Sequence, residues 1–104
     1  MSTLKITPWL EPGPPTETTL RQMLAAEGLD PYRWGNAPHD VYAPHQHSYH
    51  KVIYVVRGSI TFGLPESGKE ITLHAGDRLD LPARVVHNAV VGPEGVSCLE
   101  AHRR

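Results

Sequence analysis

The chain has 104 residues, of which 39% are hydrophobic and 20% charged, enough to bury one core but too few to build two independent domains. Ten basic and eleven acidic residues are mixed along the sequence and give a net charge of -1, so we expect neither a nucleic-acid nor a membrane partner. No run has the length of a membrane span, and no apolar run typical of a secretory signal follows Met1, so a cytoplasmic location is expected.

The first forty residues are expected to form an arm that carries one short helix. Several early prolines interrupt regular structure, and Thr16 then supplies a side chain that favours a helix N-terminus. Apolar residues at helical spacing follow, and Gly28 and Pro31 end the segment. Tyr32 and Trp34 belong to the turn-rich connection that comes next, where they either close one mouth of a cavity or anchor the loop.

From residue 41 onward the pattern changes to short apolar runs separated by turns. The expected strands are residues 45–57, 59–64, 70–74, 78–81, 85–91 and 96–102. Strands at this spacing without intervening helices predict an antiparallel all-β sandwich or barrel. We therefore divide the chain into an N-terminal arm with its helix, residues 1–40, packing on a β-barrel, residues 41–104, within one structural domain overall.

Two histidines, His45 and His47, precede the apolar run 52–56. Residues two apart share one face of a strand, so both imidazoles are expected on the same side. Neutral imidazole is the commonest protein ligand for transition metals. The pair therefore predicts half of a metal site.

Residues 45–91 resemble the cupin superfamily, whose motifs read Gly-x5-His-x-His-x3,4-Glu-x6-Gly and Gly-x5-Pro-x-Gly-x2-His-x3-Asn. The residues that fit these two motifs are His45, His47, Gly58, Gly76, Pro82 and His87. The resemblance implies an antiparallel jelly-roll barrel whose interior holds His45, His47 and His87 around one divalent metal. It also implies a homodimer, because cupin barrels commonly pair through a sheet edge and an N-terminal arm.

Four positions depart from these motifs. His39 stands where the first motif begins with Gly, and Lys51 stands where it has its ligand Glu. Arg84 and Val91 replace the second Gly and the Asn of the second motif. A side chain is costly at the positive φ that Gly tolerates, so the loop before His87 is expected to follow a different path.

Lys51 shares one side of a regular strand with the two histidines, so its side chain is expected to project into the interior. Three arrangements are open. In the first, metal binds through three imidazoles while Lys51 extends to solvent or to a carboxylate, for which Glu100 is the candidate. In the second, metal binding is lost and the His and Lys cluster holds an anionic ligand. In the third, a desolvated, neutral Lys51 acts as a base or amine nucleophile.

The remaining histidines and the single cysteine are expected to be structural. His39, His74 and His102 are expected at the surface. His50 has the opposite parity to Lys51 and is expected at the surface or in an interface, unless a bulge makes it a fourth metal ligand. Cys98 lies in an apolar-leaning segment and is expected to be a buried structural thiol.

Alternation along the strands predicts a mostly apolar interior. The expected inward set is Tyr49, Ile53, Val55, Ile60, Phe62, Leu79, Leu81, Val85, Ala89 and Val91. Small barrels leave space for one modest ligand, and a small, partly apolar organic acid or carbonyl compound fits this lining. Tyr49 is either structural or donates a hydrogen bond to a ligand oxygen.

Three neutral imidazoles would leave a divalent metal its full charge, and Fe, Ni, Cu, Mn, Co and Zn all suit nitrogen donors. Iron or copper would allow oxygen chemistry, as in the three-histidine dioxygenases among cupins, whereas zinc or nickel would act as a Lewis acid in isomerisation or hydrolysis. Lys51 and Tyr49 are then the candidate catalytic side chains. The alternative is a non-catalytic small-molecule binding or sensor module, with or without metal, that keeps Lys51 in its pocket.

Overall fold

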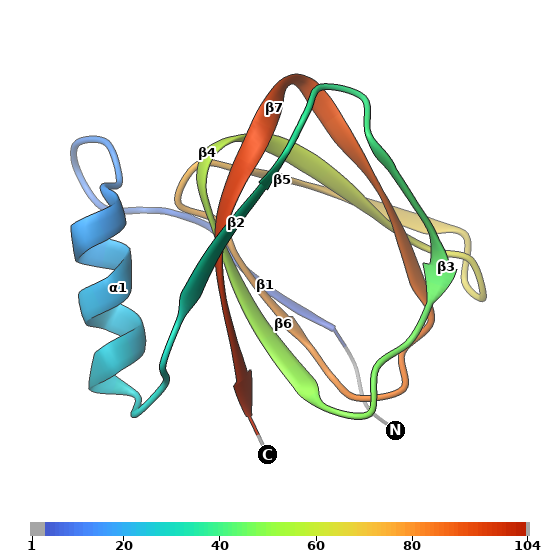
Figure 1. Ribbon diagram of the computed structural model, residues 1–104, viewed down its shortest axis with the longest axis horizontal. Coiled ribbons are helices and arrows are strands. Elements are labelled where there is room, and N and C mark those ends of the chain that lie inside the picture. The colour runs from blue at the N-terminus through green and yellow to red at the C-terminus, as the bar shows by residue number, and fades with distance from the viewer. Residues whose placement is uncertain (1–3, 104) are drawn as a thin grey trace.

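The computed structural model describes residues 4–103, which form an antiparallel sheet wrapped around a core, with one helix on the outside (Figure 1). The strands are β1 (Lys5–Thr7), β2 (Tyr32–Asn36), β3 (Val41–His45), β4 (His50–Leu64), β5 (Lys69–His74), β6 (Arg78–Leu81) and β7 (His87–Arg103). Their order in the sheet is β1-β6-β4-β7-β2, with β3 also pairing with β7 and β5 with β4. Each pairing is antiparallel. The predicted all-β class with one short helix is confirmed.

The two long strands β4 and β7 each replace two shorter strands that the sequence predicted. β4 continues through Gly58 because that residue adopts a φ of +80°, which bends the strand without ending it. The register with β7 shifts on either side of this bend. The first part of β4 therefore pairs with β6 and the second part with β5, so one strand serves both halves of the fold.

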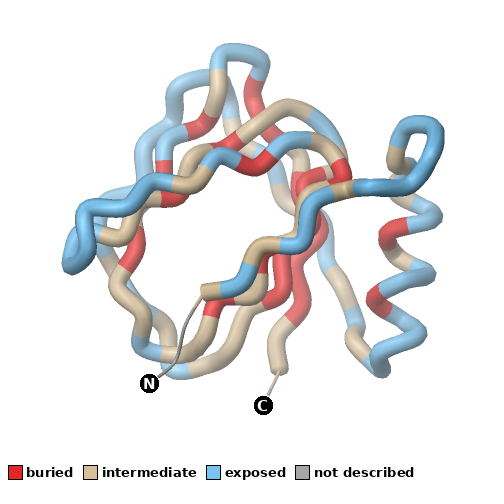
Figure 2. Tube along the Cα trace, turned by 180° about the vertical axis from the view of Figure 1, so that it is seen from behind, coloured by how far each residue is buried: buried red, intermediate tan, exposed pale blue. Residues whose placement is uncertain are grey.

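The helix α1 (Glu17–Ala26) begins as the sequence predicted. The Thr16 side chain accepts a hydrogen bond from the Thr19 backbone N–H at 3.1 Å. Leu20 and Leu24 are fully buried and pack on a cluster formed by Val52, Tyr54 and Leu99. Figure 2 shows the buried positions of the helix on its side facing the sheet. α1 therefore covers the outer face of the sheet. Within residues 4–103, no helix has the length and apolar character needed to cross a bilayer.

The sequence did not predict β2. Pro31, Gly35 and Pro38 indicated turns, but Tyr32–Asn36 is a strand that pairs with the second half of β7. Here pairing with a distant segment overrides weak local preference. β1 likewise joins the sheet by pairing with β6. The boundary proposed at residue 40 between arm and barrel stays a prediction.

The interior is an apolar cluster built mainly from alternate residues of the strands. Of the predicted inward set, Ile53, Val55, Ile60, Phe62, Leu79, Leu81, Ala89 and Val91 are buried in this cluster. Leu73, Val96 and Cys98 complete it, and the partly buried Val85 packs against it. The alternate residues of β4, Val52 and Tyr54, point to the other face of the sheet and pack against α1. The predicted alternation is therefore confirmed, and β4 is covered on both faces.

Candidate metal centre

Three histidines from three different places in the chain meet at one end of the interior. His45 ends β3, His87 begins β7, and these two residues are direct partners in the antiparallel register. His47 lies in the segment between β3 and β4, so the strand predicted from residue 45 is interrupted there. The ring centroids lie 4.3 Å apart for His45 and His87, 4.9 Å for His45 and His47, and 5.3 Å for His47 and His87. One nitrogen from each ring lies within 4.8 Å of the other two.

Hydrogen bonds orient two of these rings. Nδ1 of His45 donates to the Ala43 carbonyl oxygen at 2.7 Å, and Nδ1 of His87 donates to the Val85 carbonyl oxygen at 2.9 Å. Because a carbonyl only accepts, these bonds place the proton on Nδ1 and leave Nε2 with its lone pair. Metal-binding histidines are typically held in this way.

The third ring, His47, has a buried Nε2 for which the described residues supply no hydrogen-bond partner. Buried polar atoms are rarely left in this state, so the atom has a capacity that a ligand can fill. Burial and the neighbouring positive charge of Lys51 lower the pKa of His47 to about 4. Burial also lowers the pKa of His87. All of these features favour the neutral imidazole that binds metal, and the three residues fit a divalent transition metal.

Lys51 projects into the interior from β4, and its Nζ lies 3.4 Å from Oε2 of Glu100 on β7. The predicted contact between the two residues is confirmed. The Glu100 side chain is only 3% exposed. Its Oε2 accepts hydrogen bonds from the Tyr32 hydroxyl at 2.6 Å and from Nε2 of His102 at 2.7 Å. Its Oε1 accepts a hydrogen bond from Nε1 of Trp34 at 3.0 Å. Burial opposes ionisation, but these bonds and Lys51 outweigh it and hold the Glu100 pKa below its usual range.

The surroundings of Glu100 correct two expectations from the sequence. His102 is not an ordinary surface residue, because it bonds Glu100 and its ring stacks on Tyr49 with centroids 4.0 Å apart. Tyr32 and Trp34 line the cavity as well as tying β2 to Glu100. Each pair, Tyr32 with Trp34 and Glu100 with His102, has the two-residue spacing of one strand face. This spacing is the signal that sequence reasoning missed.

The loop before His87 also differs from expectation. Arg84 was expected to divert the chain, but it keeps the left-handed backbone of a glycine, with φ +66°. Its N–H donates to the His47 carbonyl oxygen at 2.7 Å, which joins the two segments that carry the histidines. His39, at the other replaced glycine, has φ +67° and donates its N–H to the Val91 carbonyl oxygen at 3.1 Å. Both positions therefore have the positive φ that favours glycine, so the reason for expecting a different path before His87 does not apply.

The other expected structural residues lie away from the histidine cluster. Nε2 of His50 lies 3.5 Å from Oδ1 of Asp80, and His50 is not part of the three-histidine group within the described residues. His74 and His39 are exposed, as predicted. Cys98 is buried, also as predicted, and burial raises the pKa of its thiol to about 12. A thiol with this pKa is not a ready nucleophile.

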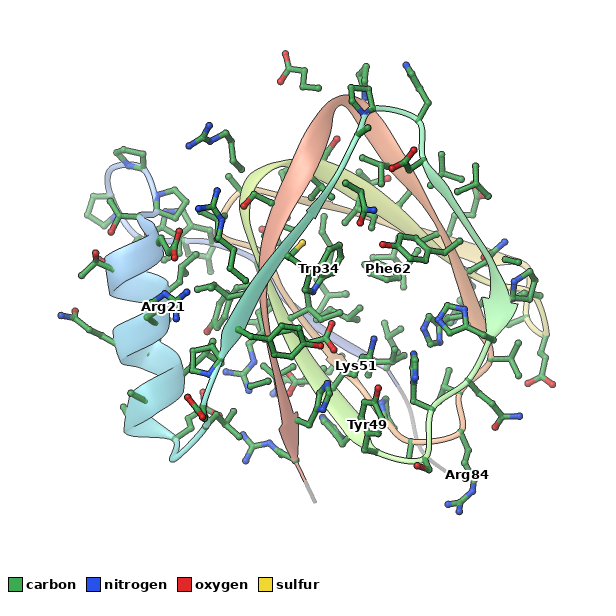
Figure 3. The ribbon with its side chains drawn as sticks, viewed as in Figure 1. Arg21, Trp34, Tyr49, Lys51, Phe62 and Arg84 are labelled. Atoms are coloured by element: carbon green, nitrogen blue, oxygen red, sulfur yellow. The ribbon has the colours of Figure 1, made fainter. Side chains whose placement is uncertain are left out.

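A cavity of about 330 Å³ adjoins the site. Its lining is partly aromatic and aliphatic, and includes Trp34, Tyr42, Tyr49, Ile53, Ile60, Phe62 and Ala89 beside His45, His87, Lys51 and Glu100. Figure 3 shows Trp34, Phe62 and Lys51 directed into the space between the strands and Arg84 directed away from it. The cavity is therefore apolar over much of its wall, with imidazoles and an ion pair as its polar groups.

A family model for the cupin domain matches residues 33–101. Among solved structures, the chain is similar to an RmlC-like cupin from Shewanella frigidimarina, with 27% identity and a TM-score of 0.61 over 71% of this chain and 64% of that one. It is similar to the polyketide cyclase RemF from Streptomyces resistomycificus, with 25% identity and a TM-score of 0.63 over 71% of this chain and 54% of that one. It is also similar to KdgF from a Halomonas species, with 27% identity and a TM-score of 0.60 over 73% and 70% of the two chains.

The chain thus spans less than two thirds of the RmlC-like cupin and of RemF. No curated protein matches the sequence. The family match covers more than half of the chain and includes all three histidines, and the neighbouring structures share the jelly-roll fold that the resemblance implied. The chain belongs to the cupin family.

Proposed function

We propose that this protein binds one divalent transition metal through His45, His47 and His87 and acts on a small, partly apolar organic acid or carbonyl compound in the adjoining cavity. The observation that carries the proposal is the arrangement of the imidazoles. Two have Nδ1 committed to backbone carbonyls, and the third has a buried Nε2 without a partner among the described residues. Such a set is suited to binding a metal ion through its free nitrogens.

The chain's own residues would hold and surround the ligand. Phe62 and Ile60 form part of the apolar wall, and Tyr49 lines the cavity with a hydroxyl that can donate to a ligand oxygen. Lys51 supplies a positive charge on the same surface. A bound iron or copper ion would supply oxygen chemistry, and zinc or nickel would supply Lewis-acid chemistry.

An enzymatic role is supported by the similarity to RemF, which is named as a polyketide cyclase. Because the likeness covers 54% of that protein, its reaction is not carried over to this chain. What RemF supports is an enzyme as the first hypothesis for a cupin barrel of this kind.

Elemental analysis tests the proposal most directly. Protein purified without a metal-affinity tag should contain close to one transition-metal ion per chain, and a His45→Ala/His87→Ala double variant should contain none. A His74→Ala variant is the matched control, because His74 is exposed and outside the cluster. The proposal fails if the parent holds no metal even after reconstitution with iron, nickel, copper and zinc.

The second candidate function is a non-catalytic module that binds or senses a small molecule. It is favoured by Lys51, which stands where the cupin motif has a carboxylate ligand and is held by Glu100. Turnover of a carbonyl or carboxylate substrate by the metal-loaded protein would support the enzyme. Tight binding of a metabolite without turnover would support the module.

A further inference from the structure

We propose that Lys51 is an anion-binding residue, whose ammonium group holds the carboxylate of a small aromatic carboxylic acid while the ring of that acid lies on the apolar wall of the cavity. This inference rests on the ligand-binding half of the proposed function. It does not require the metal, so the two can be tested separately.

The first argument is the unused hydrogen-bonding capacity of Lys51. An ammonium group carries three N–H donors, and the Lys51 side chain is only 14% exposed. Its anionic contact within the described residues is Oε2 of Glu100 at 3.4 Å. Charge-assisted hydrogen bonds are normally about 2.7–2.9 Å long, so this contact is loose. A largely buried cation with one loose partner still gains from a second anion.

The second argument is that Glu100 is already occupied by other donors. Tyr32 and His102 donate to the same oxygen that faces Lys51, at 2.6 and 2.7 Å, and Trp34 donates to the other oxygen at 3.0 Å. The carboxylate therefore shares its charge among several shorter bonds. Glu100 holds Lys51 in place beside the cavity without taking up its full capacity to donate.

The third argument is the shape and chemistry of the rest of the cavity. Trp34 and Tyr42 meet edge to face, with ring centroids 6.4 Å apart, and Phe62 and Ile60 add further apolar wall. Flat aromatic ligands pack favourably on such surfaces. A volume of about 330 Å³ lies at the small end of ligand pockets.

The charge arrangement favours a carboxylate over a phosphate. The described lining contains one lysine and no arginine, and Lys51 acts as a point charge without the fork of a guanidinium. A single compact cation beside an apolar wall suits a monoanion attached to a hydrophobic body.

The test uses benzoate as the probe and the metal-free 104-residue chain as the protein. The two tryptophans provide internal reporters in ¹H–¹⁵N spectra. Trp34 lines the cavity, whereas the Trp9 indole donates to the Gly13 carbonyl oxygen elsewhere on the molecule. Benzoate should bind saturably and shift the Trp34 indole resonance while leaving that of Trp9 in place. Benzamide, which keeps the ring but lacks the charge, should bind at least tenfold more weakly.

Variants then assign the charge to one residue. Lys51→Met should weaken benzoate binding at least tenfold in calorimetry, and Lys69→Met, which removes an exposed lysine outside the cavity, should leave it unchanged. If Lys51→Met does not fold, Lys51→Gln together with the benzamide comparison decides the matter. Equal binding by the parent and the Lys51 variants, or no saturable binding of benzoate at all, would overturn the inference.

A nickel titration of the same metal-free parent separates this inference from the proposed metal function. Benzoate binding that depends on Lys51, without nickel binding, would mean that only the metal proposal fails. If nickel binds, and the Lys51 variants bind benzoate as well as the parent does, only the present inference fails.

Discussion

Two residues with left-handed backbones, His39 and Arg84, flank the histidine site. For residues with a Cβ, this conformation costs about 1–2 kcal/mol. Each is held by a backbone hydrogen bond to the barrel: His39 to the Val91 carbonyl and Arg84 to the His47 carbonyl. Strain that is maintained in this way is common beside functional sites, where it fixes the position of neighbouring side chains.

Gly58 is the residue whose replacement should damage the fold most clearly. An added Cβ would lie 2.0 Å from the Gly95 carbonyl oxygen, so Gly58→Ala should destabilise the protein by about 3 kcal/mol or more. Gly68→Ala is the matched control. Gly68 also has a positive φ, +73°, but open space around it, so it should cost only about 1 kcal/mol. Urea unfolding of both variants measures the difference, and equal losses would contradict the steric argument.

The acid sensitivity of the metal-free protein should depend on His47. Its pKa falls from about 6.5 in the unfolded chain to about 4 in the folded protein, so the unfolded state binds more protons between these values. The free energy of unfolding should therefore be highest above pH 6.5 and fall as the pH drops to 5. Urea unfolding in the presence of a chelator measures this slope.

A His47→Gln variant serves as the comparison for that pH series, because glutamine does not titrate. Its slope between pH 7 and 5 should be shallower than that of the parent. The remaining slope includes His87, whose pKa is lowered by burial as well. An identical slope in the two proteins would show that His47 is not the group responsible.

At the scale of elements, α1 is held on the sheet by its apolar face and at its C-terminal end. Leu20 and Leu24 pack on the outer side of β4 and β7. Glu27, which caps the helix, forms ion pairs with Arg78 of β6 and Arg103 of β7. The ion pair with the Arg78 guanidinium and the burial of Leu20 and Leu24 together attach α1 to the sheet. A helix of this length is too short to be stable alone.

The apolar contact should dominate this attachment. Leu24→Ala should lower the free energy of unfolding by about 3 kcal/mol, because the side chain is fully buried. Met23→Ala is the adjacent control, since Met23 is 38% exposed and should cost about 0.5 kcal/mol or less. Thermal or urea unfolding measures both. Similar losses for the two variants would mean that α1 does not contribute its buried face to the core.

At the scale of the whole molecule, β4 and β7 carry most of the organisation. They pair with each other, and each also pairs with shorter strands, so the sheet is continuous from β1 to β2. The site lies where this sheet brings the end of β3, the start of β7 and the beginning of β4 together. Figure 1 shows β2 on the left and β3 on the right of the space that these strands enclose.

We predict that the protein is a homodimer in solution. Exposed apolar side chains are present on paired strands, with Val41 of β3 opposite Val90 of β7, and such surface is typical of an association site. Light scattering at micromolar concentration should give twice the chain mass of 11.5 kDa. A mass of one chain across that concentration range would contradict the prediction.

Much of the fold followed from local patterns. Thr16, the apolar spacing and Gly28 predicted the helix, because caps and periodicity act within a few residues. Alternation predicted the inward residues, because successive side chains of a strand point to opposite faces. Motif spacing predicted that His45, His47 and His87 would meet, and the structure brings them together.

Only the tertiary structure decided the surroundings of Lys51. β2 forms because Tyr32 and Trp34 lie opposite the second half of β7, although the local sequence favours turns. Tyr32 and Glu100 are 68 residues apart in the chain, so local sequence preferences cannot predict the hydrogen bond between them. The sequence by itself determined the helix and the strand faces, since these depend on short-range geometry. The histidine set was indicated by the resemblance to the cupin motifs. The position of Lys51 against a fully bonded Glu100 required the folded sheet, because it depends on which distant strands become neighbours.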